Sequence, residues 1–319
     1  MKEKEKAKNI TLGKAIDDFI ESRDKILSPA TTKAYKSYRK NRFQNLMDKQ
    51  ISSITDSVLQ RAINDELSAK RNISGKNGRV KNVGSVSPKT VCNALGLIRA
   101  VLNTHKIETV DIDLPKPVPT NGRTLTPDEI GRLINASKNT VSELPILLAV
   151  WIGLRRSEIA ALKKSDFNFE EETVFIHSAL VQNDKNAWVE KGTKTYKSTR
   201  LLSCPSYILD KVKLLDDGLI FSGHPNNMLN GLHRICERNG IPIIRFHDLR
   251  HSAASVMLLL NVPDKYAMER GGWTSKQTMT GRYQHTIDTE RQAIDTTINN
   301  YYIALLKADN ANENANATK

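Results

Sequence analysis

Four short segments of the 319-residue sequence carry cationic, imidazole and phenol side chains at spacings that could serve a reaction. They are GLRRSEIAAL at 153–162, KGTKTYKSTRLL at 191–202, HDLRHS at 247–252 and GGWTSKQTMTGRYQH at 271–285. Guanidinium groups donate paired hydrogen bonds to phosphoryl oxygens and stay charged at any working pH. A phenol is a nucleophile once a base or a positive field removes its proton. Together these groups suit chemistry at a phosphate ester.

Each of these residues also has an ordinary structural explanation. Arg155 and Glu158 are three apart in a predicted helix and could form a surface ion pair. His247 and Arg250 have the same spacing, and such a pair is usually a partly buried histidine beside an exposed charge. Lys194 could simply be a solvated lysine. Tyr283 could be a half-buried packing residue, and Trp273 could be a core aromatic residue.

The order of these residues along the chain distinguishes the two explanations. The chain resembles the tyrosine recombinase, or phage integrase, family over nearly its whole length. The matching motifs are G-L-R-x-x-E at Gly153–Glu158, a lysine in a T-K-T hairpin at Lys194, H-x-L-R-H at His247–His251, a glycine before His or Trp at Gly272-Trp273, and T-x-x-Y-x-H at Thr280–His285. The helical start of the chain also resembles the family's SAM-like core-binding domain, through Ser28-Pro29, Thr31, Tyr35 and Ser87-Pro88.

The resemblance implies a catalytic set of six residues: Arg155, Lys194, His247, Arg250, Trp273 and Tyr283. Tyr283 would attack a DNA phosphodiester and form a 3′-phosphotyrosine, while Arg155 and Arg250 clamp the phosphate. Lys194 would protonate the departing 5′ oxygen. His247 would take the phenol proton or balance charge around it.

Two further residues receive supporting roles from the resemblance. Trp273 stands where many relatives have histidine, so it can pack the site and donate its indole N–H but cannot shuttle a proton. Glu158 is expected to orient Arg155 or His247. The phosphotyrosine conserves bond energy, so religation is expected to need no ATP, and the resemblance implies no cofactor and no metal. The acidic run at 170–172 is interpreted as a solvated turn rather than a metal site.

The elements that must position these residues are mainly helical. Amphipathic helices are expected after Thr11, from Ser28-Pro29 through Leu46, from Thr55 and from Ser87-Pro88, with a basic loop at 71–86. Beyond a proline-rich stretch, helices are expected from a capping box at 126–129, over 144–162 and at 228–239, 247–260, 265–270 and about 287–306. Strands are expected at 173–181, 187–194 and 199–203.

The predicted fold is therefore α+β, mainly α with a small antiparallel sheet. An N-terminal SAM-like helical core-binding domain precedes a C-terminal tyrosine-recombinase catalytic domain. The predicted division is a basic N-terminal extension at 1–10, the core-binding domain at 11–109, a linker at 110–123, the catalytic domain at 124–307 and a disordered tail at 308–319. The short extension predicts that the arm-binding domain of many relatives is missing.

Charge and composition fit this interpretation. Residues 1–120 hold 23 basic and 13 acidic side chains, against 25 and 22 in the rest, so a polyanion partner is expected at the first third. Three dispersed cysteines, Cys92, Cys204 and Cys236, favour a reducing compartment without disulfides. No stretch of roughly 20 apolar residues is present, so no membrane association is expected.

The predicted function is site-specific recombination that integrates or excises a mobile element such as a viral genome. The expected partners are double-stranded DNA at recombination core sites, a homotetramer on that DNA and, as a candidate, an accessory excision factor. The expected location is the cytoplasm, at the nucleoid. Three alternatives stay open: a xer-like resolvase, an activity like that of type IB topoisomerases and a catalytically inactive DNA-binding protein.

Overall fold

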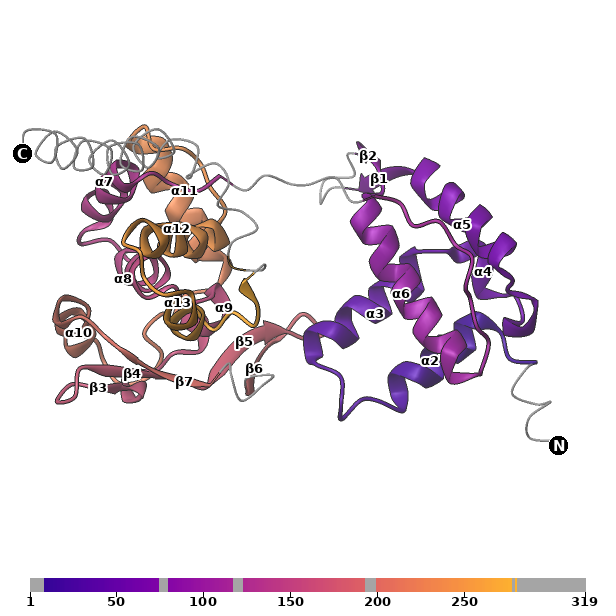
Figure 1. Ribbon diagram of the computed structural model, residues 1–319, viewed down its shortest axis with the longest axis horizontal. Coiled ribbons are helices and arrows are strands. Elements are labelled where there is room, and N and C mark those ends of the chain that lie inside the picture. Colours follow the sequence, from indigo (N-terminus) through magenta and orange to yellow (C-terminus); the bar gives the residue numbers. More distant parts are fainter. Residues whose placement is uncertain (1–8, 75–79, 117–122, 193–198, 277–278, 280–319) are drawn as a thin grey trace, which may run out of the picture. The chain divides into compact units, whose positions relative to one another are not determined.

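The computed structural model describes residues 9–74, 80–116, 123–192, 199–276 and 279. The chain divides into two compact units (Figure 1). The first unit comprises Met1–Thr120 together with Val181–Val189, and the second comprises Asn121–Leu180 and Glu190–Lys319. The predicted helix at about 287–306 and the tail lie outside the described residues.

Helices build the first unit. They are α2 (Leu12–Glu21), α3 (Pro29–Asn41), α4 (Gln44–Met47), the 3-10 turn η1 (Ile51–Ser53), α5 (Asp56–Ser68) and α6 (Pro88–Thr104). Four of them begin where the sequence predicts, because Thr11, Ser28, Thr55 and Ser87 each accept a hydrogen bond from a backbone N–H of the first turn. Their apolar faces share one core that includes Ile16, Leu59 and Ile98.

Two predictions for this unit are wrong in detail. The second helix does not run through Leu46, because Phe43 adopts a left-handed conformation with φ of 50° and separates α3 from α4. The stretch at 71–86 is not a loop: β1 (Lys70–Ser74) and β2 (Val80–Ser85) form an antiparallel pair. Its asparagine, serine and glycine residues have low strand propensity, so the sequence alone favoured a loop.

The second unit combines helices with short strands. Its helices are α7 (Pro127–Ser137), α8 (Glu143–Leu147), the π-helix η2 (Leu148–Ile152), α9 (Arg156–Ala161), η3 (Lys164–Asp166), α10 (Ser206–Lys213), α11 (Asn226–Arg238), α12 (Phe246–Leu259) and α13 (Asp264–Gly271). Its strands are β3 (Phe167–Asn168), β4 (Thr173–Ile176), β5 (Ser178–Gln182), β6 (Trp188–Gly192) and β7 (Arg200–Ser203). The predicted capping box is present, since Thr126 and Glu129 bond to each other's backbone N–H.

The strands form an antiparallel sheet in the order β3-β4-β7 and a separate β5-β6 pair, part of which belongs to the first unit. The predicted strand at 173–181 is therefore two strands in different sheets, separated at His177. The predicted helix at 144–162 is also interrupted. It changes to η2 after Leu147, turns at Gly153 with φ of 84° and restarts as α9. The break matters because Arg155 lies in it.

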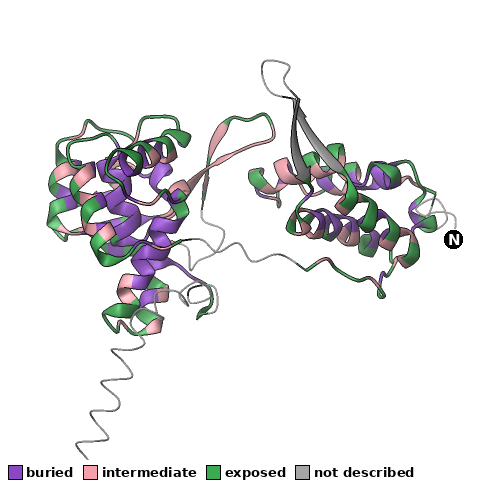
Figure 2. Ribbon diagram, turned by 90° about the horizontal axis from the view of Figure 1, so that it is seen from above, coloured by how far each residue is buried: buried purple, intermediate pink, exposed green. Residues whose placement is uncertain are grey.

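One apolar core holds the second unit together. Buried residues of α8, η2, α11 and α12 contribute to it. In Figure 2 the buried stretches of the ribbon, coloured purple, gather in the interior of this unit. Helix α12 packs against η2 and α13, and α13 packs against β7. The loop after η2, the start of α12 and the end of α13 are therefore held next to one another.

Within the described residues, no helix is long and apolar enough to cross a membrane.

The three cysteines are free thiols, with Cys204 and Cys236 buried and Cys92 half-buried. Burial raises the pKa of the Cys204 thiol to about 12 and that of Cys236 to about 11. Both thiols are thus poor nucleophiles at neutral pH.

Candidate active site

Arg155 is fixed at the N-terminus of α9 by two partners. Its Nη1 donates to Glu158 Oε1 at 2.6 Å, and its Nη2 donates to the carbonyl of Gly272 at 2.7 Å. The other oxygen of Glu158 accepts the backbone N–H of Arg155 at 2.9 Å. The Arg155 side chain remains 34% exposed while that of Glu158 is 3% exposed, so the ion pair joins a partly accessible arginine to a buried carboxylate.

Arg250 lies on α12 and is almost fully buried, with 1% of its surface exposed. Its Nη1 donates to the carbonyl of Gly153 at 2.6 Å, and its guanidinium carbon lies 4.1 Å from the ring centroid of Trp273. A carbonyl oxygen and an aromatic face both favour a buried cation, which is costly without such partners. The cationic group is therefore held in one orientation before any ligand arrives.

These contacts form a closed circuit around the two arginines. Arg250 bonds to Gly153, two residues before Arg155, and stacks on Trp273. Arg155 bonds to Gly272, the residue before Trp273. The structure thus brings three of the six predicted catalytic residues into one cluster, although they are about 120 residues apart in sequence. Trp273 is also core, as its residue type suggests, because it packs with Ala254, Ala267 and Met279.

His247 lies on the same helix, three residues before Arg250, and its side chain is exposed. Its ring meets that of His251 edge-on with centroids 4.9 Å apart. The start of this helix is stabilised by Asp248, which accepts the backbone N–H and two guanidinium N–H groups of Arg245. Lys194 and Tyr283 lie outside the described residues.

The double glycine at the end of α13 allows the close approach. A Cβ on Gly271 would overlap the ring of Trp273, and one on Gly272 would lie 3.1 Å from Arg200 Nη1 and 3.5 Å from Arg155 Nη1. Gly272 also has a left-handed backbone with φ of 65°. Both positions therefore require the absence of a side chain.

The sequence model of the phage integrase family matches residues 123–290, which is more than half of the chain.

The chain belongs to the phage integrase family.

Relatives of this integrase-family chain agree with the assignment. A tyrosine recombinase described as XerC-like from Caldanaerobacter subterraneus is 24% identical and aligns with 86% of this chain and 79% of its own. The integrase of Salmonella phage P22 is 27% identical over 66% of this chain and 58% of its own. The prediction of a tyrosine recombinase, an enzyme of site-specific DNA recombination, is confirmed.

Solved integrase structures share the fold. The Tn1549 transposon integrase in complex with transposon right end DNA has a TM-score of 0.66 at 16% identity, covering 90% of this chain and 99% of that chain. A lambda integrase tetramer bound to a Holliday junction has a TM-score of 0.57 at 18% identity, covering 86% and 77%. The predicted fold class, mainly α with small antiparallel sheets, is confirmed.

Sequence reasoning missed one charged residue of the cluster. Arg200, the first residue of β7, is buried and donates to both oxygens of Glu158, at 3.3 Å from Nη1 and 3.0 Å from Nη2. The signal available was its position two residues before Leu202 in a strand, since alternate residues face the same side. Glu158, expected to orient Arg155 or His247, bonds to Arg155 and Arg200.

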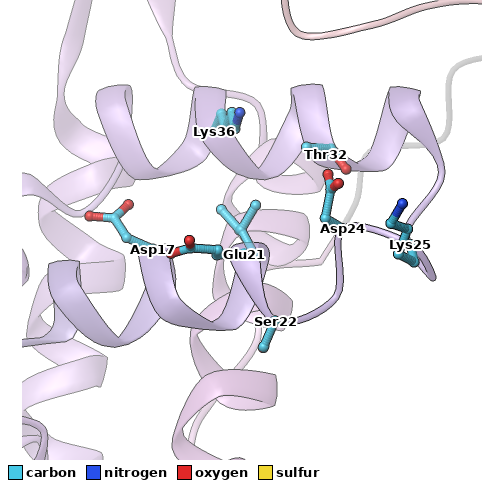
Figure 3. A pocket seen from close by; sticks show the side chains of 8 residues that line it. Asp17, Glu21, Ser22, Asp24, Lys25, Thr32 and Lys36 are labelled. Carbon is cyan, nitrogen blue, oxygen red and sulfur yellow. The ribbon is translucent and has the colours of Figure 1, made fainter.

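A hollow and an acidic turn are the other surface features considered as ligand sites. A hollow of about 600 Å³ in the first unit lies between α2 and α3 (Figure 3). Three carboxylates, Asp17, Glu21 and Asp24, line it together with Lys25 and Lys36, so the hollow has no excess of positive charge to attract a phosphate. Among the described residues no group of three metal-ligating side chains occurs, and Glu170–Glu172 are exposed in the turn between β3 and β4, as interpreted from the sequence.

Gly271→Ala tests how tightly this integrase cluster is packed. The new methyl group must displace the buried Trp273 ring, so we expect a loss of about 1–3 kcal/mol in unfolding free energy. Thermal unfolding should show it as a fall in Tm of roughly 2–4 °C per kcal/mol. Gly131→Ala in α7 is the matched control, because a Cβ there meets nothing within 4 Å, and its Tm should stay level or rise. Equal Tm values for the two variants would contradict the packing described.

Proposed function

We propose that the chain cleaves and rejoins double-stranded DNA at recombination core sites through Tyr283, with Arg155, Lys194, His247, Arg250 and Trp273 completing the active site. The observation that carries the proposal is the circuit joining Arg155 to Arg250 through Gly153, Gly272 and Trp273. Two guanidinium groups held in one place form a clamp for a single phosphate.

The first reaction step is a transesterification. The Tyr283 phenol oxygen attacks phosphorus, the bond from phosphorus to the 5′ oxygen breaks and a 3′-phosphotyrosine forms. His247 receives the phenol proton or balances the charge around it, and Lys194 gives a proton to the departing 5′ oxygen. Attack by the 5′ hydroxyl of another strand on the phosphotyrosine reverses these bond changes and frees Tyr283. The number of phosphoester bonds is conserved, so the exchange needs no nucleotide hydrolysis.

Charge stabilisation is assigned to the arginines. Negative charge builds up on the non-bridging phosphate oxygens during attack, and fixed donors already aimed at these oxygens stabilise it without reorganisation. The Arg155 side chain is held by Glu158 and stays partly exposed, and Arg250 is oriented by Gly153 and by the Trp273 ring. Trp273 stands where many relatives have histidine, and its assigned roles are to pack the site and to donate its indole N–H.

The wider assignments are also proposals. Residues 11–109 are assigned to core-site binding and 124–307 to catalysis, joined by a linker at 110–123, with 1–10 as a basic extension and 308–319 as a tail. The excess of 23 basic over 13 acidic residues in 1–120 supports DNA binding there. The lambda integrase tetramer on a Holliday junction supports a homotetramer as the active assembly. The proposed role is integration and excision of a mobile element at the nucleoid, with an accessory factor for excision.

A suicide DNA substrate tests the central proposal. In such a duplex a nick lets the cleaved 5′-hydroxyl fragment diffuse away, so the covalent intermediate accumulates. We expect the full chain to form a protein–DNA adduct that survives denaturing electrophoresis, with the DNA mapped to Tyr283 by peptide mass. DNA binding without any adduct would identify a catalytically inactive DNA-binding protein instead.

Lys194→Ala tests the general acid. We expect the variant to cleave a normal strand about 10²–10⁴-fold more slowly than the unmodified chain, the usual contribution of a positioned acid. A substrate whose 5′-bridging oxygen is replaced by sulfur should restore its rate, since a thiolate leaves without a proton. Lys191→Ala, three residues earlier at the end of β6, is the matched control and should need no rescue. A Lys194→Ala variant that stays slow on the sulfur substrate contradicts the assignment.

A further inference from the structure

Arg200 is a buried arginine for which the reaction above has no role. It begins β7, six residues after Lys194, and pairs with Ile176 of β4. Its side chain is 5% exposed, compared with 34% for Arg155. Its guanidinium donates to Glu158 and to the Arg270 carbonyl, so its charge serves the protein interior.

The guanidinium of Arg200 has partners on two other segments. Nη1 and Nη2 donate to the two oxygens of Glu158, and Nε donates to the carbonyl of Arg270 at 3.1 Å. Arg270 is the penultimate residue of α13, and the chain continues from there through Gly272 and Trp273 toward Tyr283. One side chain thus connects β7, α9 and the C-terminal end of α13.

Glu158 accepts more hydrogen bonds than a simple ion pair would give it. It accepts from Arg200 through both oxygens, from Arg155 Nη1 and from the Arg155 backbone N–H. Burial raises the pKa of the Glu158 carboxyl, but the charges and hydrogen bonds of Arg200 and Arg155 outweigh burial and hold the pKa below its ordinary value. Removing a carboxylate from water is costly, and the donors of Arg200 and Arg155 together offset that cost at Glu158.

We propose that Arg200 is a positioning residue that holds the Glu158 carboxylate in place and thereby leaves the Arg155 guanidinium aimed at the scissile phosphate. Through the Arg270 carbonyl it also ties the strand that follows Lys194 to the helix end that leads to Tyr283. The proposal rests on the role proposed above for Arg155. The proposal predicts that removal of Arg200 weakens stabilisation of the charged phosphate more than it weakens the other steps of cleavage.

The experiment compares two suicide substrates, one with a normal scissile phosphate and one with a methylphosphonate there. The methyl group replaces a non-bridging oxygen and removes the negative charge that the clamp must stabilise. Single-turnover adduct formation at saturating DNA is measured for the full chain, for Arg200→Gln and for the control Arg234→Gln, an exposed arginine on α11. A misplacement of ~1 Å can cost about 10²-fold in rate.

We expect Arg200→Gln to slow cleavage of the phosphate about 10- to 100-fold, while its deficit on the methylphosphonate is several-fold smaller. Arg234→Gln should match the unmodified chain on both substrates. Equal deficits of Arg200→Gln on both substrates would overturn the positioning role, because a generally weakened fold does not distinguish them. Failure of the unmodified chain to form any adduct would instead overturn the proposed function.

A double variant covers the case in which Arg200→Gln does not fold. Glu158→Gln combined with Arg200→Gln removes both buried charges together, so neither is left unpaired. If Arg200 acts through Glu158, the double variant cleaves the phosphate no more slowly than Glu158→Gln alone. Losses that multiply across the two positions would show that Arg200 acts by another route.

Discussion

Tyr283→Phe is expected to bind core-site DNA with the affinity of the unmodified chain and to form no covalent adduct at all. The substitution removes one hydroxyl group, which is the atom that bonds to phosphorus, and leaves the aromatic ring. A phenyl ring has no atom that can bond to phosphorus in this reaction, so the loss should be complete rather than partial. Binding is measured by mobility shift and cleavage by the suicide substrate.

The neighbouring sequence offers matched controls for this variant. Tyr301→Phe and Tyr302→Phe remove the same hydroxyl from the chain at positions outside the T-x-x-Y-x-H motif. Both should form the adduct at the rate of the unmodified chain. An adduct that persists in Tyr283→Phe and disappears in one of these two would move the nucleophile to that position.

Arg250→Ala is the other substitution from which we expect a very large effect. It deletes the buried guanidinium that bonds to the Gly153 carbonyl and stacks on Trp273. Loss of one fixed donor from a partly dry site typically lowers the rate by about 10²–10³-fold, or roughly 3–4 kcal/mol. Single-turnover adduct formation at saturating DNA should show this loss with little change in the dissociation constant.

Arg250→Lys should recover little of the rate. An ammonium is a compact charge that cannot donate the parallel pair of bonds a guanidinium gives, nor stack flat on an indole ring. The matched control is Arg245→Ala at the N-cap of the same helix, where the arginine side chain is 52% exposed and pairs with the buried Asp248. Asp248 keeps the backbone N–H of residue 245 as a donor in this variant, so its rate should change by a small factor. Comparable rates for Arg250→Ala and Arg245→Ala would remove Arg250 from the clamp.

The cluster could be predicted from sequence because its members are few and their order is specific. Short motifs predict Arg155, Arg250 and Trp273, and the structure places them in one circuit. The partner Arg200 could not be chosen in the same way. The strand reads R-L-L-S, so Arg200 shares a face with Leu202, but these letters do not say that this face is buried while Leu201 is 60% exposed. Which face is inside depends on the sheet register.

The helix break that the sequence did not predict also depends on contacts between distant parts of the chain. Helices with a serine or threonine cap were located well, because the cap and the apolar period are local signals. The break at Gly153 was not, since 144–162 is apolar enough to continue as one helix. Its interruption depends on tertiary contacts, including the bond that Arg250 makes to the Gly153 carbonyl. Local sequence does not encode a hydrogen bond from a residue 97 positions away.

The near-complete burial of Arg250 separates two responses to ionic strength. Docking onto DNA releases counter-ions from the phosphate backbone, so the affinity of the chain should fall steeply as salt is added. Mobile ions screen exposed charges over a Debye length of about 8 Å at physiological salt but act much less on buried ones. Arg250 has lost its water before the DNA arrives, because only 1% of its surface is exposed. Once the complex has formed, the rate of strand cleavage should therefore change little with salt concentration, although salt strongly affects formation of the complex.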